Sequence, residues 1–310
     1  FLMGSFATGF LLFGIALIYG VAGSFDINAI ASAVAAGTDK AAWLYAGLVM
    51  LIVGLGFKMS AVPFHFWAPD VYEGSPTVIT AFMATIVKIA AFAAFFRLFS
   101  TCFAPVYDEW VNIVQVITVL TLVVANITAV HQHSVKRLLA YSSVAHAGYL
   151  LISLVAMNDI SASAILYYVI AYSVATITAF TVLHNVEGEN QNAVIDSFNG
   201  LAKRNPYLAF CMGISLLSLA GIPPLAGFFG KYYLFTVAFQ SGYVWLVLVA
   251  VVTSLVGIYY YFRIIVAMYL KSTEKGILIE VPVRHTIILA VSVLLTILFG
   301  VFPDLLVGLI

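Results

Sequence analysis

The 310-residue sequence predicts an all-α polytopic membrane protein with about nine transmembrane helices. The first observation behind this is composition: hydrophobic residues make up 64% of the chain, charged residues 8%, and the mean hydropathy is +1.11. Because a soluble domain carries about 25% charged residues, this chain lacks the polar surface needed to face water on most sides. The second observation is a succession of apolar segments with short connections, each long enough to cross a bilayer in about 20 residues.

Nine segments reach the required length. In order along the chain they are 1–23, 42–64, 77–101, 110–130, 138–157, 162–184, 206–239, 243–270 and 286–310. The longest polar stretch between them, 184–205, leaves no room for a soluble domain. A formal net charge of zero gives no electrostatic reason to expect a nucleic-acid partner.

The start of the chain and its cysteines carry further expectations. Phe1 opens directly into an apolar run without a charged n-region or a cleavage site, so we do not expect a signal peptide. Because this start also lacks Met, we expect the sequence to begin part-way through a longer protein. Cys102 and Cys211 stand singly in or beside apolar segments without metal-ligand spacing, and we expect both to be small core residues.

The positions of lysine and arginine predict the orientation in the membrane. The loops on the side where the chain starts, called the starting side below, hold eight of them: Lys136, Arg137, Lys203, Arg204, Arg263, Lys271, Lys275 and Arg284. The loops on the other side hold two, Lys40 and Arg97. Because basic loops are retained in the cytoplasm, the starting side is predicted to be cytoplasmic, or to face the matrix or stroma in an organelle.

Three lysines remain, and they lie well inside predicted spans: Lys58, Lys88 and Lys231. None of the thirteen acidic residues lies well inside a predicted span. A lysine at mid-span costs about 2.5–3.5 kcal/mol on insertion scales, and desolvation lowers its pKa, so it can load and release a proton. Snorkelling to the interface is the structural alternative. It is easier for Lys58 than for Lys88, which lies about 13–16 Å from either end of its span.

Two of these lysines lie beside predicted helix breaks. Pro63 follows Lys58 closely, and the segment 221–231, which ends at Lys231, contains two prolines and three glycines. Irregular backbone at membrane depth is tolerated only against protein or water, and paired discontinuous helices are typical of transporter inverted repeats. His65 and Trp67, just past Pro63, are expected at the interface in structural roles.

A polar stripe marks the fifth predicted span. Ser142, His146, Tyr149 and Ser153 recur at helical spacing on one face. Histidine titrates near neutral pH, so His146 is a candidate relay between lysines; a core histidine bonded to a neighbouring hydroxyl or carbonyl is the equal alternative. Lys136, at the start of the same helix, fits either a cytoplasmic anchor or a proton-path residue.

The segments 56–77, 136–149 and 221–231 resemble the antiporter-like subunits of respiratory complex I. The stretch 81–92 is most similar to the N-type members, called subunit 2 in mitochondria and plastids; L and M relatives usually carry a His-Ala-Ala pattern there. The resemblance implies fourteen helices, built from two inverted five-helix repeats that each contain a broken helix.

On that map, residues 1–101 form the end of the first repeat (helices six to eight), 102–270 form the second repeat (helices nine to thirteen), and 271–310 form a cytoplasmic loop and the C-terminal helix. The first five helices are then missing from the sequence. Lys58, Lys88, His146 and Lys231 match the family's proton-transfer positions. The family also pairs the lysine at the position of Lys58 with a glutamate on the fifth helix, which this sequence does not contain.

The implied function is a proton-translocating membrane subunit of NADH–quinone oxidoreductase, driven by quinone reduction elsewhere in the complex. No cofactor or metal is expected in this chain; NADH, FMN, iron–sulfur clusters and quinone are expected in other subunits. The implied partners are the lipid bilayer and other membrane subunits, including M-type and K-type neighbours. The implied location is the bacterial inner membrane or the equivalent organelle membrane.

Three alternatives compete with this interpretation. A subunit of a cation/proton antiporter or of a membrane-bound hydrogenase shares the same architecture and differs in sodium dependence. A purely structural membrane subunit predicts that the lysines tolerate replacement by methionine. A solute transporter is weaker, because the spans offer few convergent polar groups beyond the lysines and His146.

Overall fold

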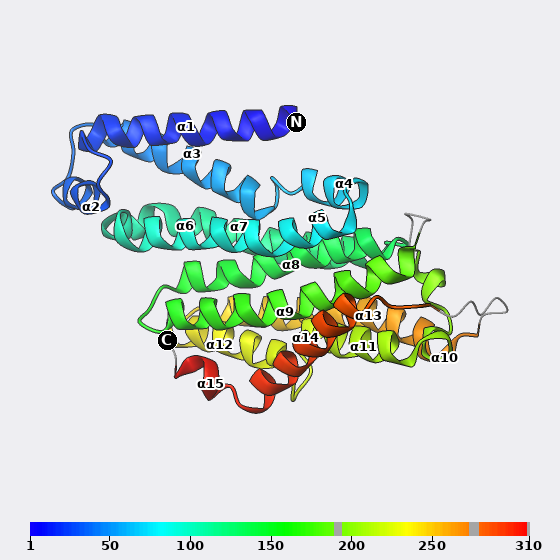
Figure 1. The fold of residues 1–310 in the computed structure, drawn as a ribbon. Helices are drawn as coiled ribbons and strands as arrows, with labels where there is room; N and C mark the ends of the chain where they lie inside the picture. Colours follow the sequence, from blue (N-terminus) through cyan, green and yellow to red (C-terminus); the bar gives the residue numbers. More distant parts are fainter. Residues whose placement is uncertain (189–193, 273–278, 309–310) are drawn as a thin grey trace.

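The computed structural model describes residues 1–188, 194–272 and 279–308, and in these ranges it is a bundle of long helices lying side by side (Figure 1). The N-terminal helices are α1 (Leu2–Ala22), α2 (Ile27–Ala35), α3 (Ala41–Met59), α4 (Trp67–Gly74), α5 (Thr77–Phe82) and α6 (Lys88–Thr101). A π-helical turn, Met83–Val87, joins α5 to α6. The next are α7 (Tyr107–Val130), α8 (Val135–Ala156), α9 (Ser161–Glu187), α10 (Leu201–Arg204), α11 (Pro206–Ala220), α12 (Ala226–Gln240) and α13 (Val244–Leu270). The last are α14 (Val283–Val301) and α15 (Asp304–Val307).

Eight helices of the described chain are long and apolar enough to cross a membrane. The ninth predicted span, 206–239, is divided between α11 and α12, which are 15 residues each. All nine predicted spans therefore have helical counterparts, and the all-α prediction is confirmed. Three predicted ends are wrong: the span 42–64 ends earlier, at Met59, the span 162–184 continues to Glu187, and the helix of the span 286–310 ends at Val301.

Both predicted breaks are present, and they have the same local geometry. After α3, Ser60 adopts a left-handed conformation (φ 61°) and the next N–H, of Ala61, donates to Gly56 O at 2.8 Å. After α11, Gly221 is left-handed (φ 84°) and the N–H of Ile222 donates to Leu217 O at 3.0 Å. In each case a bond five residues back satisfies a terminal carbonyl of the helix.

Packing at the second break requires a residue without a side chain. A Cβ added to Gly227, in the first turn of α12, would lie 1.9 Å from Ser218 O of α11. The close approach of the two half-helices therefore depends on glycine at this position. Small residues allow the same kind of backbone contact between helices in many membrane proteins.

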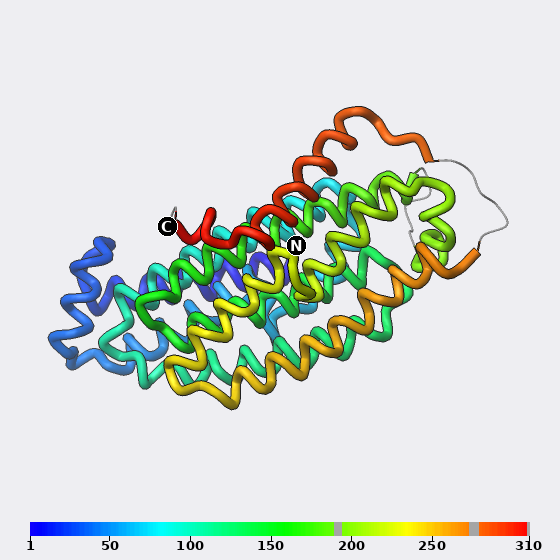
Figure 2. Tube along the Cα trace, turned by 90° about the horizontal axis from the view of Figure 1, so that it is seen from below, coloured from blue at the N-terminus to red at the C-terminus, as the bar shows by residue number. Residues whose placement is uncertain are grey.

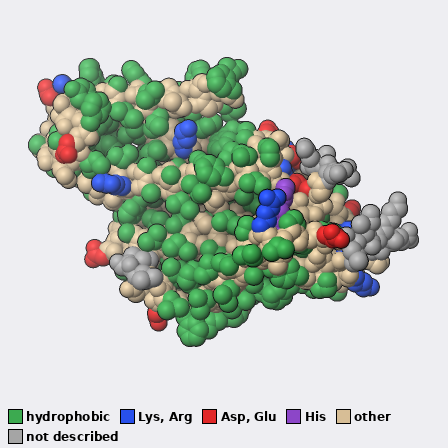
Figure 3. Space-filling view, viewed as in Figure 1, with side chains coloured by type: hydrophobic (Ala, Val, Ile, Leu, Met, Phe, Trp, Pro, Cys, Tyr) green, Lys and Arg blue, Asp and Glu red, His purple; other side chains and the backbone are tan. Residues whose placement is uncertain are grey.

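The helix α8 is the centre of the bundle. Almost all of its residues from Val135 to Ala156 are buried, and it packs against α4, α7, α9, α12 and α13. α14 lies across α9 and α12, on the outside (Figures 1 and 2). Hydrophobic side chains cover most of the face seen in Figure 3, as expected for a surface in contact with lipid. Both cysteines are free and buried, as predicted.

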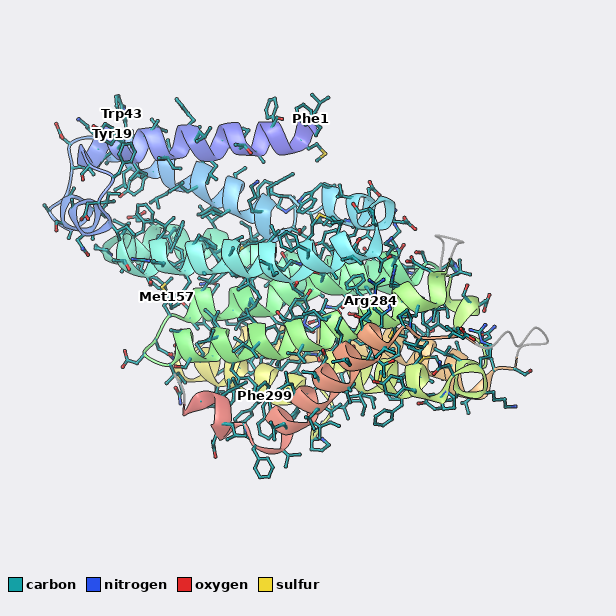
Figure 4. The ribbon with its side chains drawn as sticks, viewed as in Figure 1. Phe1, Tyr19, Trp43, Met157, Arg284 and Phe299 are labelled. Carbon is teal, nitrogen blue, oxygen red and sulfur yellow. The ribbon has the colours of Figure 1, made fainter. Side chains whose placement is uncertain are left out.

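The two ends of the bundle are distinct. Figure 4 shows Tyr19, Trp43 and Met157 toward one end and Arg284 toward the opposite, starting-side end. Lys275, one of the eight basic residues assigned to the starting side, lies outside the described residues. The assignment of this side to the cytoplasm and the division into repeats at residues 101 and 270 stay predictions.

Candidate functional site

Lys88 is buried in the interior of the bundle. It is the first residue of α6, directly after the π-helical turn, and is 2% exposed. Its Nζ donates to both the carbonyl and the hydroxyl oxygen of Ser143 on α8, each at 2.5 Å. Tyr172 of α9 donates to the same Ser143 hydroxyl at 2.8 Å. Among the described residues no carboxylate lies within 4.0 Å of Lys88, so its ammonium depends on neutral oxygens alone.

His146 lies one helical turn further along α8 and is bonded through both ring nitrogens. Its Nδ1 lies 2.6 Å from the hydroxyl of Tyr168 on α9, and its Nε2 lies 3.2 Å from the hydroxyl of Tyr261 on α13. Tyr261 also bonds to the hydroxyl of Ser142. The histidine is thus a buried, bonded core residue, and at the same time it links hydroxyl groups on three helices.

Lys231 lies on α12 against the second break. Its Nζ donates to Ala220 O, the last residue of α11, and to the Ser254 hydroxyl of α13, both at 2.9 Å. The ammonium also lies 4.8 Å from the ring centroid of Tyr149, within the range of a cation–π contact. The helix end at the break thus supplies a backbone carbonyl to a buried cation.

These groups form a single polar row along α8. Ser143 contacts Lys88, His146 stands next, and the ring of Tyr149 lies 5.9 Å from the imidazole and against Lys231. The predicted stripe on this helix is therefore real and entirely buried. It can change hydrogen-bond direction at each hydroxyl, because Ser and Tyr both donate and accept.

Lys58 does not join this row. It lies in the last turn of α3 and its side chain is exposed, so the prediction that it is buried is wrong for this chain. The physical reason is that Lys58 lies on the uncovered side of this turn, while Gly56 and Met59 in the same turn are buried, and no described group bonds its Nζ. Trp67 instead closes the break from inside, donating its indole N–H to Phe57 O at 2.9 Å.

A second buried group lies at the starting side. Lys136 is 5% exposed and donates to Ser75 O at 2.6 Å. Its Nζ lies 3.7 Å from the carboxylate of Glu187, which also accepts a hydrogen bond from Thr77. Lys136 therefore does not lie in a water-exposed loop, where the orientation count placed it.

Glu187 is the main site residue that the sequence interpretation missed. It was placed in the polar stretch after the sixth predicted span, and no acid was expected in a span. In the structure it is the last residue of α9 and is 8% exposed. A usable signal existed: Glu187 is followed directly by Gly188, a residue typical of helix C-termini.

His65 is 4% exposed and packs beside Phe66 with 4.4 Å between ring centroids, and its position at the membrane interface stays a prediction. The tyrosines Tyr168, Tyr172 and Tyr261 were not singled out, although Tyr168 and Tyr172 recur at helical i, i+4 spacing in an apolar span. Their hydroxyls supply most of the contacts between the lysines.

The discontinuous helices and the row of buried bases define the class of antiporter-like membrane subunits. Residues 1–257 match the family model of the NADH:quinone oxidoreductase/Mrp antiporter transmembrane proteins. The chain belongs to this family, and it is a multi-pass membrane protein. The predicted resemblance is confirmed.

Relatives of the chain include NADH-quinone oxidoreductase subunits N. The protein of Cytophaga hutchinsonii is 45% identical over 307 residues, which are 99% of this chain and 66% of the relative. That of Flavobacterium psychrophilum is 43% identical, over 98% of this chain and 66% of the relative. The chain therefore spans slightly less than two thirds of the length of these curated relatives.

Two solved structures share the fold. A chain of respiratory complex I from Thermus thermophilus with bound aureothin is 36% identical, with a TM-score of 0.85 over 99% of this chain and 67% of that chain. A chain of the Mrp complex from Dietzia sp. DQ12-45-1b has a TM-score of 0.88 over 99% of this chain and 65% of that chain. At 21% identity the second likeness shows the fold alone.

Proposed function

We propose that this chain belongs to a proton-translocating subunit of an NADH–quinone oxidoreductase and moves protons along the row of Lys88, His146 and Lys231. The observation that carries the proposal is the order of these groups along α8: each lysine contacts α8, and the histidine stands between them with both nitrogens bonded. The names of the relatives support the oxidoreductase rather than the antiporter.

The chemistry of the row follows from its donors and acceptors. An ammonium at Lys88 donates to Ser143, and after it loses a proton the amine can accept one instead. A hydroxyl that accepts a proton on one side and releases another on the far side passes charge without moving atoms far. The Tyr261 hydroxyl, between Ser142 and His146, has the two partners this step requires.

Lys231 is the proposed last station of the row. The Ala220 carbonyl, the Ser254 hydroxyl and the face of Tyr149 all stabilise its charged form. A proton that reaches the amine of Lys231 is therefore held until the electrostatic potential around this residue changes. In this proposal quinone reduction in other subunits supplies that change, and the cofactors NADH, FMN and iron–sulfur clusters lie there as well.

Two further groups complete the proposal. Lys136, paired with Glu187, is the charged group at the predicted cytoplasmic end and a possible entry to the row. Lys58 is proposed as an exchange partner of Lys88, on the strength of the resemblance alone. The neighbouring M-type and K-type membrane subunits are the proposed partners.

The experiment that tests the proposal replaces Lys88 by methionine in the full-length subunit, within its complex, in inverted membrane vesicles. We expect proton pumping per electron to fall while NADH oxidation and assembly persist. Lys203→Met is the matched control, because Lys203 is exposed at the starting side and contacts no member of the row. Pumping at the parental ratio in the Lys88 variant would favour a structural subunit, and sodium-dependent transport would favour an antiporter.

A further inference from the structure

A pocket of about 420 Å³ opens on the outside of the bundle between α5, α9 and α14. Its polar lining comes from Thr77, Thr181, His184, Arg284 and His285. Its apolar lining includes Ile177, Phe180 and Ile288. None of these residues belongs to the row along α8, so the pocket calls for an explanation of its own.

The polar part of the pocket is cationic. Arg284 is exposed, and the described chain places no carboxylate within 4.0 Å of its guanidinium. The rings of His184 and His285 stand edge to face with 5.5 Å between centroids. Figure 3 shows basic and histidine side chains together on an otherwise hydrophobic face, at the end where Figure 4 labels Arg284.

The start of α14 strengthens the positive potential. The helix begins at Val283 without a side-chain cap, and while the N–H groups of His285 and Thr286 donate to Pro282 O, those of Val283 and Arg284 precede the first intrahelical bond. Thr77, at the edge of the pocket, donates to Glu187. That carboxylate is paired with Lys136 and does not line the pocket, so it leaves the positive charge of Arg284 uncompensated.

Polarity changes with depth along two of the three helices. On α9, Phe180 and Ile177 lie four and seven residues before His184, or about 6 and 10 Å deeper in the membrane. On α14, Ile288 lies four residues after Arg284, about 6 Å deeper. The pocket therefore offers a guanidinium and two imidazoles at the level of the membrane surface and an apolar groove directly beneath them.

We propose that this pocket binds the headgroup of an anionic phospholipid of the bilayer. The phosphodiester lies against Arg284 and the two imidazoles, and one acyl chain lies along Phe180, Ile177 and Ile288. Basic pockets between helices on the cytoplasmic side suit such headgroups. The match of a negative headgroup to the Arg284 guanidinium and of an acyl chain to the groove selects a lipid over a free anion, which has no part that would use the groove.

The test uses the full-length subunit in its complex, reconstituted in phosphatidylcholine vesicles that contain a minority of phosphatidylglycerol with a photoreactive acyl chain. We expect the label on peptides that contain Ile177 or Ile288. Arg284→Gln is expected to reduce this labelling about fivefold, the usual effect of one basic residue near a charged membrane surface. Arg284→Lys keeps the charge and is expected to retain most of the labelling.

The control variant is Arg97→Gln, which removes an exposed arginine on the other side of the membrane and should leave the label unchanged. Equal labelling by photoreactive phosphatidylcholine, or unchanged labelling in Arg284→Gln, would overturn the proposal. Displacement of the label by inorganic phosphate would assign the pocket to a free anion and would also overturn it. None of these readouts depends on pumping, so they are separable from the proton-transfer proposal.

Discussion

The buried pair of Lys136 and Glu187 yields the most quantitative prediction. Replacing Glu187 by glutamine keeps the shape of the side chain but leaves the ammonium of Lys136 buried without a counter-charge. At the observed 3.7 Å separation and an effective dielectric constant of about 20, the attraction lost is about 4.5 kcal/mol. Removing one partner of a buried pair usually costs about 3–5 kcal/mol.

The companion variants separate this effect from loss of packing. Lys136→Met should destabilise the protein by a similar amount, because it leaves the carboxylate unpaired. The double variant Lys136→Met/Glu187→Gln buries no net charge. We expect it to cost no more than either single change, since replacing a whole buried pair is often nearly neutral.

The assay is the free energy of unfolding of the full-length subunit, measured by titration with sodium dodecyl sulfate in mixed micelles for the parent and the three variants. The prediction is a coupling energy of about 3 kcal/mol between Lys136 and Glu187. If the loss of stability in the double variant equals the sum of the losses in the two single variants to within about 0.5 kcal/mol, the two residues act independently. That result would refute the assignment of Glu187 as the partner of Lys136.

Two further predictions concern the row and the second break. Tyr261→Phe removes the hydroxyl that links His146 to Ser142; we expect slower proton pumping in inverted vesicles with assembly intact, since one hydrogen bond contributes only about 1 kcal/mol. Gly227→Ala places a Cβ 1.9 Å from Ser218 O; we expect loss of assembled complex, seen as reduced subunit content in purified membranes.

Each of these variants has a matched control. Tyr259→Phe removes an exposed hydroxyl two residues from Tyr261 and should pump at the parental rate. Gly74→Ala meets no atom within 4 Å and should assemble normally. Full pumping in Tyr261→Phe would remove that hydroxyl from the path, and normal assembly of Gly227→Ala would contradict the close packing at the break.

The sequence predicted those features that depend on local chemistry. Hydropathy located nine crossings, because each apolar segment must match the thickness of a bilayer. Prolines and glycines located both breaks, since they exclude a continuous helix. The depth of Lys88 and Lys231 in their spans predicted their burial, and helical spacing placed His146 on the same face as Ser142 and Tyr149.

Features that depend on which helices meet could not be predicted. Lys58 lies in the last turn of α3 and is exposed, whereas its neighbour Met59 is buried, and hydropathy carries no information on which side of a helix another helix packs. Glu187 is buried because α9 continues three residues past its predicted end, to where Lys136 and Thr77 meet it. To predict the role of Tyr261 from the sequence, one would have to know that α13 packs against α8.

The central claim is that protons pass along α8 through His146, and the most direct measurement is the number of protons pumped per electron by the complex carrying His146→Gln. Glutamine can still bond to the hydroxyls of Tyr168 and Tyr261, but it does not exchange a proton. The account predicts a reduced ratio with NADH oxidation and assembly preserved. A parental ratio would show that His146 is only a bonded core residue and that protons take another route between Lys88 and Lys231.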